Sequence, residues 1–142
     1  AKDGAKLVNV ISNSTVPKIS IILGGSYGAG NYAMSGRAYR PRFLYAWPSA
    51  KIAVMGGDSA AKTLSTIKLS KMNNASEEDK EKIYNQIKDK YAKQSDPRYA
   101  AARLWIDEII NPLDTRKIII ESLDIVKNEG EIKKATYGAI QV

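Results

Sequence analysis

The spacing of apolar residues along this chain predicts short strands that alternate with amphipathic helices. Residues 18–23 and 43–47 are compact runs rich in β-branched or aromatic side chains, as in buried strands. Elsewhere apolar residues recur every three or four positions, which is the spacing of one helix face. The predicted strands cover residues 18–23, 43–47 and 51–55, and the predicted helices cover residues 5–14, 29–37, 60–69, 80–93, 100–109 and 115–127. A strand–helix–strand order early in the chain indicates an α/β layer with helices packed on the sheet.

Hydroxyl and carboxylate side chains are predicted to begin several of these helices. Asp58 and Asp114 are each expected to cap the helix that follows them, by accepting a backbone hydrogen bond. Ser76 and Asp79 have the spacing of a capping box, which predicts the start of the strongly charged helix there. Residues 134–142 are expected to form a short irregular tail.

A glycine-rich turn follows the first predicted strand directly. Glycines occupy positions 24, 25, 28 and 30, and a second pair, Gly56 and Gly57, follows the third predicted strand. Glycine lets a backbone turn sharply and lets a ligand approach main-chain N–H groups closely. If a helix starts near Ala29, these N–H groups and the helix dipole favour negative charge there.

Three interpretations of the glycine-rich turn follow from its pattern. Residues 28–33 fit the dinucleotide fingerprint G-x-G-x-x-A, which requires an acidic residue about 20 positions later. No Asp or Glu occurs between Asp3 and Asp58, which argues against a nicotinamide site. The N–H groups could instead form an oxyanion hole for charge that develops during a reaction. The glycines could also serve only the packing of a strand-to-helix junction.

The composition limits the chemistry that this chain can perform. Its 142 residues are 44% hydrophobic and 26% charged, as in a globular domain, and they include no histidine and no cysteine. A Ser-His-Asp triad, a histidine zinc site and a disulfide framework are therefore excluded for the chain alone. Its net charge of +7 comes from dispersed lysines without a nucleic-acid motif, so nucleic acid is not an expected partner. No apolar run approaches the roughly 20 residues of a membrane span, so no membrane contact is expected.

Basic and aromatic residues surround the glycine-rich turn. Arg37, Arg40 and Arg42 lie together after the second predicted helix, where they could neutralise helix carbonyls, pair with carboxylates elsewhere or reach a phosphate. Nearby tyrosines are expected to be half-buried packing residues. Trp105 and Asp107 are assigned to packing and capping.

Four segments together resemble the carboxyltransferase (β) subunits of biotin-dependent acyl-CoA carboxylases, and most of all the 3-methylcrotonyl-CoA carboxylase branch. Residues 25–43 (GSYGAGNYAMSGRAYRPRF) carry the longest match. Residues 47–57 resemble the family pattern W-P-x-A-x-I-x-V-M-G-G, and residues 103–116 resemble R-x-W-x-D-x-I-I-x-P-x-D-T-R. Residues 137–142 resemble the F-G-V-F-R-M terminus of the family. Tyr32 stands where the propionyl-CoA branch has an acidic residue, which argues against a propionyl-type pocket.

The resemblance implies a crotonase-like α/β superfold with additional C-terminal helices. Such subunits contain two crotonase-like domains, and residues 1–142 resemble part of the C-terminal domain, on the biotin side, without the N-terminal domain. By resemblance, the N–H groups of Ala29 and Gly30 would form the oxyanion hole for the ureido oxygen of biotin. The expected substrate-binding residues are Tyr27, Gly28, Asn31, Tyr32, Gly56 and Gly57.

The same resemblance implies transfer of a carboxyl group from carboxybiotin to an acyl-CoA, such as 3-methylcrotonyl-CoA or a similar branched enoyl-CoA. The expected partners are the acyl-CoA, the subunit that carries biotin carboxylase and biotin, and further carboxyltransferase subunits in a homo-oligomer. The expected location is the bacterial cytoplasm, or the mitochondrial matrix in a eukaryote. Two alternatives remain open: a biotin-binding and dimerisation module that is inactive in isolation, and a biotin-dependent acyl-CoA decarboxylase component.

Overall fold

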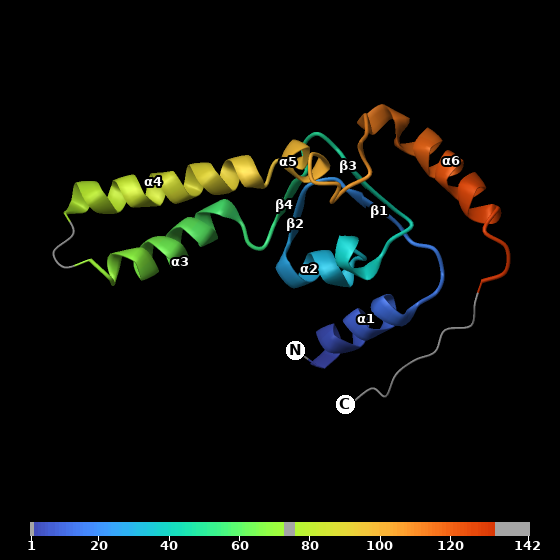
Figure 1. Ribbon diagram of the computed structural model, residues 1–142, viewed down its shortest axis with the longest axis horizontal. Helices are drawn as coiled ribbons and strands as arrows, with labels where there is room; N and C mark the ends of the chain where they lie inside the picture. Colours follow the sequence, from blue (N-terminus) through green and yellow to red (C-terminus); the bar gives the residue numbers. More distant parts are fainter. Residues whose placement is uncertain (1, 73–75, 133–142) are drawn as a thin grey trace.

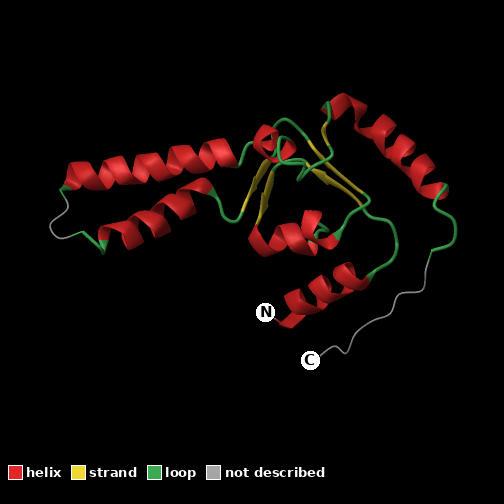
Figure 2. Ribbon diagram, viewed as in Figure 1, coloured by secondary structure: helices red, strands yellow, loops and turns green. Residues whose placement is uncertain are grey.

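The computed structural model describes residues 2–72 and 76–132, which form two small parallel sheets surrounded by helices. Figure 2 shows the strands in the middle of the molecule and the helices around them. The helices are α1 (Lys2–Asn13), α2 (Gly28–Ala33), α3 (Gly57–Leu69), α4 (Glu77–Gln94), α5 (Pro97–Ala101) and α6 (Thr115–Lys127), with single 3-10 turns η1 (Arg37–Tyr39) and η2 (Pro112–Asp114). The strands are β1 (Ile19–Ile22), β2 (Gly25–Tyr27), β3 (Phe43–Ala46), β4 (Lys51–Ala53) and β5 (Glu108–Ile109). This mixture of helices and parallel strands is the α/β class expected from the sequence.

Both sheets are parallel. The first has the order β1-β3-β5, with Ile19 opposite Phe43 and Tyr45 opposite Glu108. The second pairs β2 with β4, with Gly25 opposite Lys51. Parallel neighbours need long crossover connections, and the chain between β1 and β3 supplies one that contains β2, α2 and η1.

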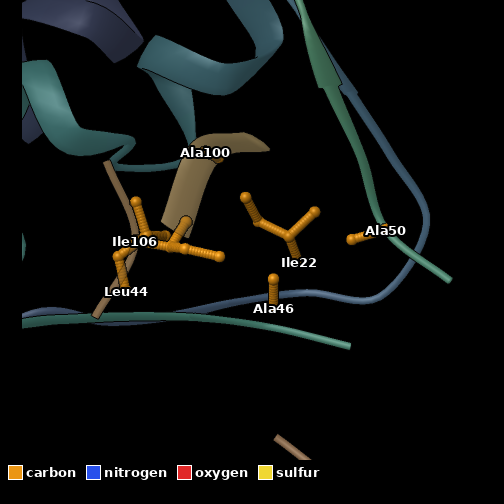
Figure 3. Packing of buried hydrophobic residues seen from close by; sticks show 6 residues of the cluster. All are labelled: Ile22, Leu44, Ala46, Ala50, Ala100 and Ile106. Carbon is orange, nitrogen blue, oxygen red and sulfur yellow. The ribbon is translucent and has the colours of Figure 1, made fainter. Parts of the chain in front are cut away.

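Small and branched apolar side chains fill the core between the sheets and α5. Figure 3 shows this cluster, in which Ile22 of β1 lies near Ala46 of β3 and Leu44 lies near Ile106. The buried members are Ile22, Leu44, Ala46, Ala50, Ala100 and Ile106. The alanines in this set let backbones approach closely, because a methyl group is the whole side chain.

Helices α3 and α4 form a hairpin that extends away from the sheets, on the side opposite to α6 (Figure 1). Helix α4 begins with the predicted capping box, because the Ser76 hydroxyl accepts from the Asp79 N–H at 3.1 Å and the Asp79 carboxylate accepts from the Ser76 N–H at 3.2 Å. Ile83 is the buried apolar residue of α4. Helix α6 is fastened to β3 by a buried contact between the Tyr45 and Ser122 hydroxyls at 2.9 Å.

The predicted helix over residues 100–109 is wrong. The helix begins earlier, at Pro97, where Asp96 accepts from the Arg98 N–H at 2.8 Å, and it ends at Ala101. Residues Glu108–Ile109 form strand β5 instead, since the Asp107 N–H donates to the Leu44 carbonyl at 2.8 Å. Pairing with β3 therefore overrides the local helical spacing of the apolar residues.

Smaller corrections concern helix ends and one unpredicted strand. The predicted helix over residues 29–37 is shorter, because α2 ends at Ala33 and Ser35 has a left-handed φ of 59°. Gly56 precedes α3 in place of the expected cap Asp58, whose carboxylate pairs with α4 instead. Asp114 lies directly before α6, but its side chain makes no capping hydrogen bond. Strand β2 was not predicted, and the expected tail over residues 134–142 lies outside the described residues.

Candidate functional site

The two glycine turns lie side by side because their strands pair in parallel. Strand β2 leads into α2 and strand β4 leads into α3, so both helices begin at the same edge of the β2–β4 sheet. Gly28 has a left-handed φ of 51°, and a Cβ at that position would lie 2.9 Å from the Val54 carbonyl oxygen. The turn at Gly28 therefore requires glycine both for its backbone conformation and for its contact with the other strand.

The N–H groups of Ala29 and Gly30 lie in the first turn of α2. The first N–H groups of an α-helix precede the intrahelical hydrogen bonds and have no partner within the helix. Ala29 and Gly30 are both exposed, and a Cβ added at Gly30 would meet no atom within 4 Å. Both residues therefore lie on the surface of the described chain.

Asn31 holds this turn in shape. Its side-chain amide donates to the Ser26 hydroxyl at 2.9 Å, which ties α2 back to β2. The backbone carbonyl oxygen of Asn31 accepts a hydrogen bond from the Gly36 N–H at 2.8 Å. Gly36 packs so closely on Asn31 that a Cβ there would collide with the Asn31 side chain, which explains the glycine.

A cavity of about 360 Å³ adjoins the glycine-rich turn. Three residues expected at the site, Gly28, Asn31 and Tyr32, line it. Its remaining lining is mainly aromatic and aliphatic. It comes from β4 and the residue after it, the end of α4, and α5 with the segment that follows it: Ile52, Ala53, Val54, Tyr91, Gln94, Tyr99 and Trp105. Tyr32 also makes an edge-to-face contact with Tyr39, with ring centres 5.8 Å apart.

The structure brings the predicted site residues to one region but gives them different surroundings. Tyr27, Ala29 and Gly30 belong to the same turn as Gly28 but do not line the cavity. Gly56 and Gly57 begin α3 at the neighbouring turn, also outside the cavity lining.

Sequence reasoning missed the cavity residues that lie far along the chain. Tyr91 falls within the predicted helix over residues 80–93 without any expected role at the site, and Trp105 was assigned only to packing. An apolar stripe at the end of α4 looks the same in the sequence whether it meets a core or a cavity, so no local signal separated the two.

Arg37 and Arg42 pair with carboxylates elsewhere in the chain. This is one of the three roles that the sequence leaves open for these arginines. Arg37 Nη2 lies 2.8 Å from Asp107 Oδ1, and Arg42 Nε lies 2.6 Å from Glu129 Oε1. Asp107 does not cap a helix. Its second oxygen accepts from the Leu44 N–H at 2.7 Å, so it joins β3 to the segment before β5.

Asp58 and Lys88 form an ion pair near the turn that contains Gly56 and Gly57. Lys88 Nζ lies 3.0 Å from Asp58 Oδ1, and this contact lowers the pKa of Asp58 from its ordinary value of 3.8 and raises the pKa of Lys88 from 10.5. Within residues 2–72 and 76–132, no cluster of carboxylates is arranged to hold a metal ion. The described helices include none long and apolar enough to cross a membrane.

Comparison with known proteins connects this geometry to one family. The family described as the carboxyl transferase domain matches residues 1–137. The biotin-dependent 3-methylcrotonyl-coenzyme A carboxylase beta1 subunit of Mycobacterium tuberculosis is 42% identical over 100% of this chain and 27% of its own length. The mitochondrial methylcrotonoyl-CoA carboxylase beta chain of Dictyostelium discoideum is 47% identical over 91% of this chain and 23% of its own length.

A solved structure agrees with these sequence matches. The geranyl-CoA carboxylase beta subunit of P. aeruginosa superposes with a TM-score of 0.82 at 38% identity, and covers 98% of this chain and 27% of that one. The chain thus spans about a quarter of the length of the curated relatives that it matches.

Proposed function

Because the chain belongs to the family of carboxyl transferase domains, we propose that it forms the biotin side of a carboxyltransferase that transfers a carboxyl group from carboxybiotin to an acyl-CoA. Its architecture is the crotonase-like α/β fold of that family. Its similarity to methylcrotonyl-CoA carboxylase β subunits favours 3-methylcrotonyl-CoA or a similar branched enoyl-CoA as the acceptor. The single observation that carries the proposal is the first turn of α2, where Ala29 and Gly30 are exposed between Gly28 and Asn31, which line an aromatic cavity.

The glycine-rich turn suits the role of an oxyanion hole for biotin. When bound, carboxybiotin would supply the carboxyl group, and the negative charge of the ureido group after transfer would need stabilisation. The amides of Ala29 and Gly30 are fixed by the start of α2, so they stabilise that charge without reorganising. No histidine or cysteine is needed for this role, which agrees with their absence from the sequence.

Other residues of the site would shape it and bind the reactants. Gly28 and Asn31 fix the path of the backbone, so that the two amides keep their direction. Tyr32 presents an aromatic ring to the cavity, where an apolar group of a reactant would pack. Gly56 and Gly57 lie at the start of α3, where a Cβ at Gly56 would meet no atom within 4 Å, so this turn would leave space for part of a reactant.

The proposal is tested by removing one amide in the full-length carboxyltransferase subunit that contains this chain. Gly30→Pro removes the N–H, and we expect carboxyl transfer to fall by roughly a hundredfold or more, as for the loss of one oxyanion-hole donor. Glu78→Pro is the matched control, since it makes the same change in the first turn of α4, away from the cavity. Gly30→Ala keeps the N–H and should retain much more activity than Gly30→Pro.

Equal activity of Gly30→Pro and Glu78→Pro would contradict the assignment of the amides. An assembled wild-type enzyme that transfers no carboxyl group between biotin and any acyl-CoA would contradict the function itself. Circular dichroism of each variant separates either result from a loss of folding.

A second function is favoured by the exposure of Ala29 and Gly30 in this chain. An oxyanion hole works in a site that excludes water, whereas here both residues are exposed. The chain by itself would then act as a biotin-binding and assembly module without turnover. Turnover assays of the chain alone, and of the chain mixed with the N-terminal domain of the same enzyme, distinguish this role from independent catalysis.

A further inference from the structure

Trp105 reaches the cavity from a tight turn that follows α5. Trp105 lines the same cavity as Gly28 and Tyr32, and it also lines a second hollow together with Tyr32, Arg37 and Ile106. The side chain remains 47% exposed, so the core does not hold it in place. Its position must therefore be set by the turn that carries it.

The turn itself is strained and locally supported. Leu104 has a left-handed φ of 58°, a conformation that costs roughly 1 kcal/mol for a residue with a Cβ. The Trp105 N–H donates to the Ala100 carbonyl at 3.0 Å, which closes the turn. Tyr99 meets Trp105 edge to face at 6.0 Å, and the Arg103 guanidinium lies 3.3 Å from the centre of the Tyr99 ring.

Arg37 and Asp107 link this turn to the helix that carries the oxyanion-hole amides. Arg37 follows α2, and its Nε donates to the Trp105 carbonyl at 3.0 Å while its Nη2 donates to Asp107 Oδ1 at 2.8 Å. The other oxygen of Asp107 accepts from the Leu44 N–H on β3 at 2.7 Å. One guanidinium and one carboxylate thus fix the backbone of Trp105 relative to α2 and to the sheet.

The lining of the cavity indicates what Trp105 would contact. Aromatic rings and aliphatic side chains make up most of it, and the polar side chains Asn31 and Gln94 are uncharged. Such a lining suits an uncharged apolar group and not the phosphates of coenzyme A. In the proposed reaction two reactants carry such a group: the acyl chain of the acyl-CoA and the ring system of biotin.

We propose that Arg37 and Asp107 are positioning residues, which hold the Trp105 ring as a wall for the apolar group of a reactant. This inference rests on the proposed carboxyltransferase function. The two residues act on binding through the placement of Trp105 and take no part in the chemical step. Their loss should therefore raise KM for one reactant with little change in kcat.

The test uses the assembled full-length enzyme and measures carboxyl transfer in both directions. In one, 3-methylcrotonyl-CoA accepts the carboxyl group from carboxybiotin; in the other, free biotin accepts it from carboxylated 3-methylcrotonyl-CoA. We expect Asp107→Asn to raise KM for one of these reactants roughly fivefold to tenfold and to change kcat less than twofold. Glu129→Gln is the matched control, because Glu129 pairs with Arg42 in a similarly exposed ion pair that does not touch the cavity. The reactant whose KM rises identifies the group that the wall contacts.

A double-mutant cycle shows whether Asp107 acts through Trp105. Trp105→Ala should raise KM for the same reactant, and adding Asp107→Asn should raise it no further, since the positioned ring is already gone. Arg37→Lys keeps the charge but lacks the fork that bonds Trp105 and Asp107 together, so it should resemble Asp107→Asn. If KM of the double variant rose by the product of the increases seen in the two single variants, the proposal would be overturned.

Fluorescence gives a readout that is independent of turnover. The chain contains two tryptophans, so Trp47→Phe leaves Trp105 as the reporter in this chain. In that background Asp107→Asn should shift the Trp105 emission to longer wavelength, and Glu129→Gln should not. An unshifted emission together with unchanged KM for both reactants would refute the positioning role. An enzyme whose wild type lacks carboxyl transfer would refute the proposed function instead.

Discussion

Gly28 packs against Val54 so closely that a Cβ on Gly28 would lie only 2.9 Å from the carbonyl oxygen of Val54. The two residues belong to neighbouring turns, one after β2 and one after β4. Their contact brings the ends of the two parallel strands together and so determines where α2 begins. The placement of Ala29 and Gly30 in the first turn of α2 depends on this contact.

Gly28→Ala should destabilise the fold, because the new Cβ meets the Val54 oxygen and because φ is +51°. We expect a loss of about 1–3 kcal/mol in the free energy of unfolding. Gly30→Ala is the matched control: its Cβ enters open space within a helix, so it should be neutral or stabilising by up to about 1 kcal/mol. Urea denaturation of both variants checks this, and equal destabilisation would contradict the contact.

Replacing Tyr45 or Ser122 should cost stability in a non-additive way. Ser122 is 1% exposed, and its hydroxyl donates to the Ile118 carbonyl at 2.7 Å, so Tyr45 is the donor in the contact between the two hydroxyls. Ser122→Ala leaves the Tyr45 hydroxyl buried without its acceptor and should cost about 1–3 kcal/mol. Tyr45→Phe should cost about 1 kcal/mol.

The double variant of this pair should be less destabilised than the sum of the two single variants. Once the Ser122 hydroxyl is gone, Tyr45→Phe removes a buried donor that has already lost its acceptor. Thermal and urea unfolding measure the coupling. Strict additivity would mean that the two hydroxyls do not interact in solution.

Lowering the pH should weaken the attachment of α3 to α4 by protonating Asp58. The hydrogen bond and charge of Lys88 hold the pKa of Asp58 below 3.8 in the folded state. The contribution of the ion pair is therefore complete above about pH 4 and is lost as the pH falls through the lowered folded pKa. At high pH it is lost only above the raised pKa of Lys88, beyond 10.5.

The comparison for this pH effect is between the wild type and Asp58→Asn. Their difference in Tm should be present at neutral pH and shrink as the pH falls through the lowered folded pKa of Asp58. It should also shrink in high salt, because both side chains are exposed. Asp124→Asn is the control, since Asp124 pairs with Lys127 within a single helix and joins no two elements. A difference between the wild type and Asp58→Asn that is independent of pH would contradict the mechanism.

Leu104→Gly should stabilise the chain. Leu104 is 83% exposed and has a φ of 58°, so glycine relieves backbone strain and gives up little packing. We expect a gain of up to about 1 kcal/mol, reduced by the greater freedom of glycine in the unfolded chain. Leu113→Gly is the matched control: Leu113 is 90% exposed without a positive φ, and the change there should destabilise. Denaturant midpoints for the two variants should move in opposite directions.

The sequence by itself determined the features that are encoded locally. Apolar runs located β1 and β3, the spacing of Ser76 and Asp79 located the start of α4, and the two glycine pairs located the neighbouring turns. The resemblance carried by residues 25–43 pointed to the family that the comparison shows.

Only the tertiary structure decided the features that depend on distant partners. Strand β5 has two residues and exists because β3 offers it hydrogen bonds, whereas its own spacing favours a helix. Asp107 pairs with Arg37 only because the fold brings together two residues that are 70 positions apart in the sequence. Tyr91 and Trp105 reach one cavity because helix α4 ends beside the turn after α5. Local propensity is weak compared with such pairing and packing, so residues far apart in the sequence settle these positions together.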